Sequence, residues 1–230
     1  GHRGRVRERF RNEGLDSFET HEILELLLFY AIQRGDTNET AHNLVKRFGT
    51  LARVFDAPIS ELKKVDGIGD SSAVLLKLIP AVTSRYMISL DEKRDEIPLD
   101  NSEKVKKYIL PCFIGRASEC IYLIATDSTL RPIGCELISS GSMSTAEADM
   151  RKMMEYALSV GARYVILSHN HPNGTLNPSR EDIRMTQHVS QTFASVGITM
   201  IDHIIVSNNH VLSMMEQGYV KNKSGVLMGN

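Results

Sequence analysis

The chain has 230 residues, 42% of them hydrophobic, so it is long enough to bury one large core or two ordinary ones. Its 27 basic and 28 acidic residues leave a net charge of -1, which excludes the global positive field that drives non-specific nucleic-acid binding. No stretch approaches the roughly 18 apolar residues of a membrane-spanning helix, and three cysteines without a C-x-x-C pair argue against a disulfide framework, so we expect a cytoplasmic protein without a membrane partner.

The N-terminal half has a helical pattern. Residues 21–32 and 39–48 are apolar at helical spacing, and a glycine follows the second stretch where helices commonly end. The charge-dense segment 91–98 then separates this half from a region of different character. We therefore predict an all-α domain over residues 1–96 and a second domain over residues 100–230.

A glycine-rich hairpin near the end of the first domain is the candidate nucleic-acid site. Residues 61–86 resemble a helix-hairpin-helix, in which backbone amides at Gly67 and Gly69 could take a DNA phosphate. Asp70 has the wrong charge for that contact, and the first 96 residues hold 15 basic against 16 acidic residues. A structural or protein-contact use of this domain is therefore the stronger hypothesis and DNA the weaker one. We interpret the N-terminal basic run as a solvated or disordered tail; it consists of Arg3, Arg5, Arg7, Arg9 and Arg11.

The C-terminal half alternates strand-like and helix-like stretches. This alternation predicts an α/β domain, a sheet with flanking helices whose chemistry lies at strand ends. The predicted strands are 120–126, 133–139, 163–168 and 198–206, and the predicted helices are 145–160 and 179–196.

Residues 168–182 (SHNHPNGTLNPSRED) are the candidate metal site. His169 and His171 lie two residues apart where an apolar strand ends, and alternate side chains of an extended chain share one face. A turn over residues 172–174 reverses the chain, and a helix start then places Asp182 in a first turn from which it can face the histidines. Two histidines and one carboxylate leave a fourth position open, as in catalytic zinc sites, so we predict that these three residues bind Zn2+.

Each residue of this site also has a simpler interpretation. The pattern Ser179-x-x-Asp182 alone is typical of a helix N-terminal cap, and His169 alone is typical of a loop. The conjunction of His-x-His, a tight turn and Ser-x-x-Asp favours metal binding.

The same residues resemble the motif of JAMM (MPN+) zinc metalloproteases, and nearly the whole chain resembles bacterial RadC-type proteins. Besides the zinc motif, the HNHPNG turn, the PSREDI helix start, the strand DHIIV at 202–206 and the hairpin VDGIG at 65–69 occur in the RadC order. The resemblance implies a JAMM/MPN-type, cytidine deaminase-like sheet with flanking helices, preceded by a small all-α helix-hairpin-helix domain.

The resemblance also implies a mechanism. It assigns the general base, which activates a zinc-bound water, to Glu136, and stabilisation of the oxyanion to Ser179. It implies a metallopeptidase or isopeptidase acting on a protein or peptide substrate. Two alternatives stay open: a DNA-associated, repair-labelled RadC protein acting through its hairpin, and an inactive zinc-bound scaffold. A nucleobase deaminase is excluded, because His171 fills the position where H-x-E requires glutamate and no P-C-x-x-C follows.

Three further features concern substrate contacts and assembly. Asp149-Met150 stands where many RadC-type relatives have His-Pro, which puts substrate contacts rather than zinc binding in question. His203 lies on a predicted strand, where a packed histidine is the simpler interpretation and a role behind the metal ligands or toward substrate the alternative. Nothing in the sequence specifies a homo-oligomer.

Overall fold

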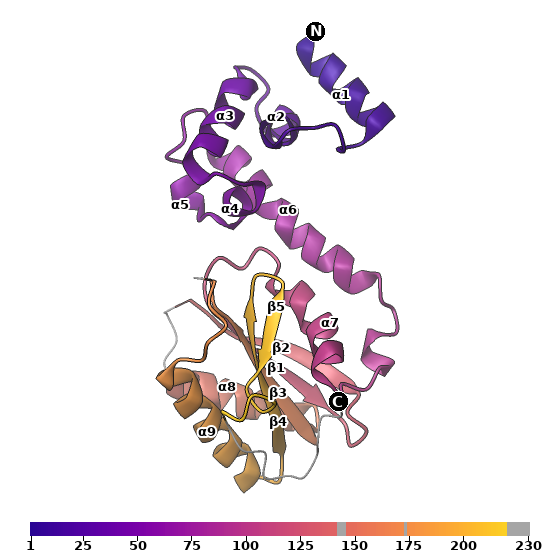
Figure 1. Cartoon of the computed structure of the whole chain (residues 1–230), viewed down its shortest axis with the longest axis vertical. Coiled ribbons are helices and arrows are strands. Elements are labelled where there is room, and N and C mark those ends of the chain that lie inside the picture. Colours follow the sequence, from indigo (N-terminus) through magenta and orange to yellow (C-terminus); the bar gives the residue numbers. More distant parts are fainter. Residues whose placement is uncertain (142–145, 173, 220–230) are drawn as a thin grey trace. The chain divides into compact units, whose positions relative to one another are not determined.

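The computed structural model describes residues 1–141, 146–172 and 174–219; residues 142–145, 173 and 220–230, with one predicted helix start and the middle of the predicted turn, lie outside this part. The chain divides into two compact units, Gly1–Arg85 and Tyr86–Asn230 (Figure 1). The boundary predicted between residues 96 and 100 lies further along the chain. In the described residues, no helix combines the length and apolar character needed to cross a membrane.

The N-terminal unit is helical. An apolar cluster from five of its helices and the hairpin forms the core, with Leu24, Leu44 and Leu76 completely buried. Asp36 begins one helix by accepting hydrogen bonds from the N–H groups of Asn38 and Glu39, so the predicted apolar stretch starts where a cap is available. The helices are α1 (His2–Glu13), α2 (Thr20–Ala31), α3 (Thr37–Phe48), α4 (Leu51–Asp56), α5 (Ile59–Leu62) and α6 (Asp70–Ser89).

The interpretation of the N-terminal basic run as a solvated or disordered tail is wrong. The run forms α1, and Arg3 donates hydrogen bonds to the carbonyl oxygens of Ile32, Gln33 and Gly35 just beyond the end of α2. Arg9 forms an ion pair with Glu22 at 2.8 Å. These arginines satisfy groups of their own unit, and this use reduces the positive charge available to a nucleic acid.

The C-terminal unit contains a five-stranded mixed sheet in the order β2-β1-β3-β4-β5. Among the described strands only β3 and β4 pair in parallel, and α9 forms the crossover between them. The elements are α7 (Ser102–Phe113), β1 (Cys120–Thr126), β2 (Pro132–Ser140), α8 (Ala146–Ser159), β3 (Tyr164–Asn170), α9 (Arg180–Ser195), β4 (Thr199–Ser207) and β5 (His210–Ser213), with a short 3-10 helix at Arg94–Glu96. The predicted fold class, an α/β sheet with flanking helices preceded by an all-α part, is confirmed.

Helices cover both faces of this sheet. One apolar cluster joins α7 to alternate residues of the central strands, including Tyr122, Ile124 and Ile166. A second apolar cluster, on the opposite face of the sheet, joins α8 and α9 to the alternate residues of the same strands, including Leu123 and Leu167. Helices α8 and α9 therefore lie on the face to which Leu167, and two residues further His169, belong.

Candidate metal centre

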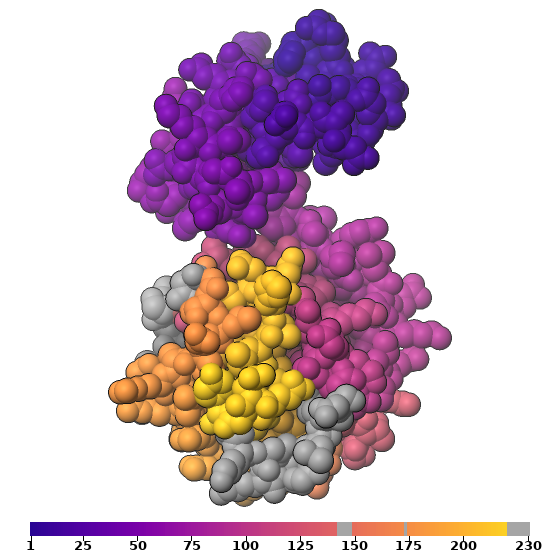
Figure 2. All heavy atoms as spheres, in the orientation of Figure 1, coloured from indigo at the N-terminus to yellow at the C-terminus, as the bar shows by residue number. Residues whose placement is uncertain are grey.

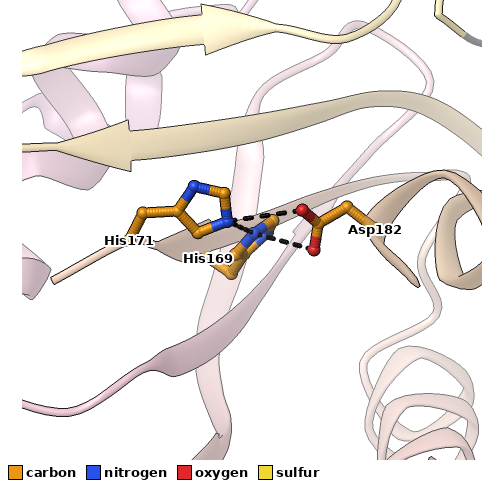
Figure 3. Close-up of side chains that lie close together, drawn as sticks. All are labelled: His169, His171 and Asp182. Atoms are coloured by element: carbon orange, nitrogen blue, oxygen red, sulfur yellow. Dashed lines mark hydrogen bonds and ion pairs between the residues drawn. The ribbon is translucent and has the colours of Figure 1, made fainter. Parts of the chain in front are cut away.

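Strand β3 places the two predicted histidine ligands on one face. His169 is the second to last residue of the strand and is completely buried, and the N–H of His171 still donates to the carbonyl oxygen of Val206 on β4. Since the backbone stays extended through this point, both imidazoles project toward the start of α9 (Figure 3).

Asp182 comes from the first turn of α9, and the two interpretations of its motif hold together. Its N–H donates to Ser179 Oγ at 3.1 Å, and the N–H of Ser179 donates to Asp182 Oδ2 at 2.7 Å, which is a capping box. The cap holds the carboxylate in place, and the carboxylate oxygens still face the two histidines. The predicted N-terminal cap is therefore also the device that orients the predicted ligand.

The three predicted ligands converge. The carboxylate oxygens of Asp182 lie 3.2 Å from His169 Nε2 and 3.3 Å from His171 Nε2, and the two Nε2 atoms are 2.9 Å apart. Burial raises the pKa of Asp182, but its interactions with the His169 ring and with Ser179 outweigh burial and hold the pKa well below its usual range. Asp182 is therefore a carboxylate at neutral pH.

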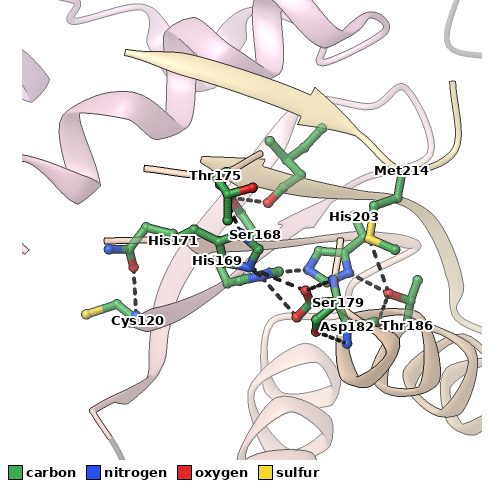
Figure 4. A network of polar contacts seen from close by, with 12 residues as sticks. Cys120, Ser168, His169, His171, Thr175, Ser179, Asp182, Thr186, His203 and Met214 are labelled. Atoms are coloured by element: carbon green, nitrogen blue, oxygen red, sulfur yellow. Dashed lines mark hydrogen bonds and ion pairs between the residues drawn. The ribbon is translucent and has the colours of Figure 1, made fainter. Parts of the chain in front are cut away.

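The far sides of both rings are engaged by further groups (Figure 4). Nδ1 of His171 lies 3.0 Å from the carbonyl oxygen of Thr175, and Nδ1 of His169 lies 2.7 Å from Nε2 of His203. His203 is fully buried on β4, and this burial lowers its pKa well below the usual value. His203 thus contacts a predicted ligand directly, as well as being a packed strand residue.

These contacts decide whether the site suits a cation. A carbonyl oxygen can only accept, so the proton of His171 is on Nδ1 and its Nε2 presents a lone pair. His169 Nε2 and the carboxylate of Asp182 face the same point. The His171 lone pair and the Asp182 carboxylate are both acceptors, so they repel at this distance unless a positive charge lies between them, and a set of two imidazoles and a carboxylate suits Zn2+.

Glu136, the general base that the resemblance implies, lies elsewhere on the sheet. Its strand position is opposite Leu123 of β1, and its carboxylate forms an ion pair with Lys152 of α8 at 3.4 Å. The side chain is about half exposed, at 44%. It is not a member of the cluster formed by the three predicted ligands.

A different carboxylate, Glu119, directly precedes the strand that pairs with the histidine strand. Ile121 of β1 is opposite His169, and Glu119 lies two residues before Ile121 and His171 two residues after His169. The backbone of Glu119 is held on its other side, where its carbonyl accepts the N–H of Gly141 at 2.7 Å. Glu119 was missed in the sequence analysis, because its relation to the histidines depends on the pairing of β1 with β3.

Asn170 fixes the segment that carries Glu119. Its side-chain oxygen accepts the N–H of Cys120 at 2.7 Å, and its amide donates to the carbonyl oxygens of Arg116 and Ser118. The residue between the two histidine ligands therefore clamps the chain on either side of Glu119.

The remaining predicted residues lie outside this centre. Met150, in the first turns of α8, packs against the core beneath it. In the hairpin, Gly67 has φ +84° and an added Cβ would lie 2.2 Å from Thr40 Oγ1, so this glycine serves close packing. The N–H of Gly69 donates to Ser72 Oγ at 2.9 Å. That contact occupies the Gly69 amide proposed for a DNA phosphate.

Known proteins agree with this architecture. Residues 99–219 match the family described as RadC-like JAB domain, and residues 2–74 match the family described as UPF0758 N-terminal. A UPF0758 protein of Fusobacterium nucleatum subsp. nucleatum is 33% identical over 225 residues, which cover 96% of this chain and 97% of that protein. The resemblance to RadC-type proteins is confirmed, and the chain belongs to the UPF0758 family, with a RadC-like JAB domain as its C-terminal part.

Proposed function

We propose that this protein is a zinc-dependent hydrolase of the JAMM type that cleaves an amide bond in a protein or peptide. One observation carries the proposal: His169, His171 and Asp182 each offer one ligand atom, and these atoms all lie within 4.8 Å of one another. Three such ligands match a catalytic zinc site with an open fourth position, whereas a structural site is usually closed by four side chains.

The chemistry divides between the ion and the chain. A bound Zn2+ would polarise a carbonyl oxygen and lower the pKa of a water molecule from 15.7 to roughly 7. His169, His171 and Asp182 would hold the ion, and Asp182 would also lower the site's net positive charge. Ser179, an exposed hydroxyl at the start of α9, is placed to donate toward an oxyanion, as the resemblance implies.

We assign the role of proton acceptor to Glu119 rather than Glu136. Two observations support this assignment: Glu119 lies two residues before Ile121, which is opposite His169, and the carboxylate of Glu136 is paired with Lys152. A general base must be within hydrogen-bond reach of the proton it takes, directly or through one water. Glu119 is exposed directly before β1, and no ion pair of the described residues includes its carboxylate, so it can act as the base without breaking one.

Metal content tests the site. We expect about one zinc per chain in the wild type and almost none in His171→Ala, because two remaining ligands hold zinc poorly. His188→Ala, which removes an exposed histidine from α9, is the matched control and should keep its zinc. Plasma mass spectrometry of the purified variants measures both. Equal zinc in His171→Ala and the wild type would rule out the proposed ligation.

Turnover tests the base. Against a random peptide library read by mass spectrometry, Glu119→Gln should keep zinc and lose roughly 10²- to 10⁴-fold in rate, and Glu136→Gln should stay within about threefold of the wild type. The reverse pattern would return the role to Glu136. A wild type that binds zinc and cleaves nothing in the library would favour the inactive scaffold.

A further inference from the structure

We propose that Thr186 and His203 are positioning residues that keep the proton of His169 on Nδ1, so that its Nε2 lone pair stays available to a metal ion. The inference rests on the metal site of the proposed function and adds two residues that act through a ligand. Thr186 lies on α9 one turn after Asp182, and His203 lies on β4 next to the strand that carries His169.

Three short contacts join these residues in a row (Figure 4). Thr186 Oγ1 is 2.6 Å from the carbonyl oxygen of Asp182 and 2.6 Å from Nδ1 of His203. Nε2 of His203 is 2.7 Å from Nδ1 of His169. Thr186, His203 and His169 are all completely buried, so no solvent can replace a missing partner.

Counting protons along the row fixes each donor. The Asp182 carbonyl cannot donate, so the hydroxyl hydrogen of Thr186 lies between these two oxygens. Thr186 must then accept from His203, which places the proton of His203 on Nδ1 and leaves its Nε2 bare. A bare Nε2 can only accept, and His169 therefore donates through its own Nδ1.

A competing acceptor does not change this count. The sulfur of Met214 lies 3.6 Å from Thr186 Oγ1, a long contact to a weak acceptor, and the carbonyl at 2.6 Å takes the hydrogen. Met214 is completely buried and covers the row with an apolar side chain. Asp182, Thr186, His203 and His169 thus form a continuous chain of hydrogen bonds. It runs from one proposed ligand, Asp182, to another, His169.

The direction of the protons has a chemical consequence. If the Thr186 hydroxyl were absent, Nδ1 of His203 would have no acceptor, and its proton would be better placed on Nε2, facing His169. His169 would then carry its own proton on Nε2, the atom that must be bare to bind metal. Groups that orient metal-binding histidines in this way commonly change metal affinity by about 10- to 100-fold when they are replaced.

Two substitutions of Thr186 separate this role from packing. Thr186→Val keeps the shape of the side chain and removes the hydroxyl, and Thr186→Ser keeps the hydroxyl and removes the methyl group. Thr192→Val is the matched control, because Thr192 Oγ1 also donates to the carbonyl one turn earlier on α9, that of His188, but contacts no histidine ring in the described residues.

Two measurements are made on each variant. Long-range 1H–15N correlation spectra of the metal-free protein at pH 8 report which ring nitrogen of His169 and His203 carries the proton. Competition with a chromophoric chelator gives the Zn2+ dissociation constant. We expect Nδ1 protonation in the wild type, Thr186→Ser and Thr192→Val, and Nε2 protonation with about 10- to 100-fold weaker zinc binding in Thr186→Val.

The outcomes distinguish this inference from the proposed function. Nε2 protonation of His169 in the metal-free wild type, or a Thr186→Val protein with unchanged tautomers and zinc affinity, would overturn the role of Thr186 and His203. Wild-type protein that shows the Nδ1 tautomers but binds no zinc would instead overturn the metal site and leave the proton path standing.

Discussion

Asp202 is a fully buried carboxylate directly before His203, and backbone and side-chain groups of the protein donate hydrogen bonds to it. Its oxygens accept the N–H groups of His203 and Met215 and the hydroxyl of Ser213. These bonds hold the segment after β5 against β4. Burial nevertheless dominates, raises the pKa of Asp202 to about 7, and the charge of Glu216 adds to that effect.

The raised pKa makes stability depend on pH. The folded protein binds the Asp202 proton more tightly than the unfolded chain, whose aspartate pKa is about 3.9, so stability falls as pH rises from about 4 to 7. Asp202→Asn removes this titration, and its amide can accept the two N–H bonds and donate to Ser213. Free energies of unfolding are measured with chelator present. We expect the value for Asp202→Asn minus that for the wild type to increase by about 2–3 kcal/mol from pH 5 to pH 8.

The wild-type protein, measured under the same conditions, is the control for this experiment. The two proteins differ only at residue 202, so contributions shared by both cancel in the difference. Parallel curves of unfolding free energy against pH would show that Asp202 keeps an ordinary pKa.

At the scale of elements, strand β3 connects the site to its surroundings through both of its faces. His169 and His171 project toward α9, and Asn170 between them turns to the chain before β1. A one-residue shift in register would exchange these roles. The position of the two predicted histidine ligands relative to β1, and with it the proposed role of Glu119, therefore depends on the pairing of β1 with β3.

This dependence explains how much could be predicted. The bounds of β1 and the convergence of His169, His171 and Asp182 follow from local patterns: a short apolar run, alternate side chains and a capping motif. Glu119 required the register between two strands, which no local pattern contains. Thr186 looks like any helix threonine until β4 is placed beside α9, and the short strand β5 left no periodic signal.

Figure 2 shows how the end of the described chain contributes to the surface of the C-terminal unit. Residues of β5 and the segment after it lie beside the loop before α9. An apolar cluster of Ile205, Met214, Leu176 and Ile183 joins them. Strand β5, which the sequence analysis did not predict, thus packs against the loop between His171 and Asp182.

At the scale of the whole molecule, the two units have separate cores. No apolar cluster of the described residues includes members of both Gly1–Arg85 and Tyr86–Asn230. The proposed ligands, the proton path behind them and the clamp on Glu119 all belong to the second unit. Among the described residues, the cluster of His169, His171 and Asp182 includes no member of the first unit, which has near-balanced charge and an engaged Gly69 amide.

A fragment of residues 86–230 should therefore bind zinc by itself. Because every contact that orients the ligands is retained, we expect a Zn2+ dissociation constant within about threefold of that of the full chain, measured by the same chelator competition. Circular dichroism would show that the fragment is folded, and the fragment with His171→Ala would show that binding uses the proposed site. A folded fragment that has lost zinc binding would mean that the N-terminal unit supports the centre, in contradiction to the separation of the cores.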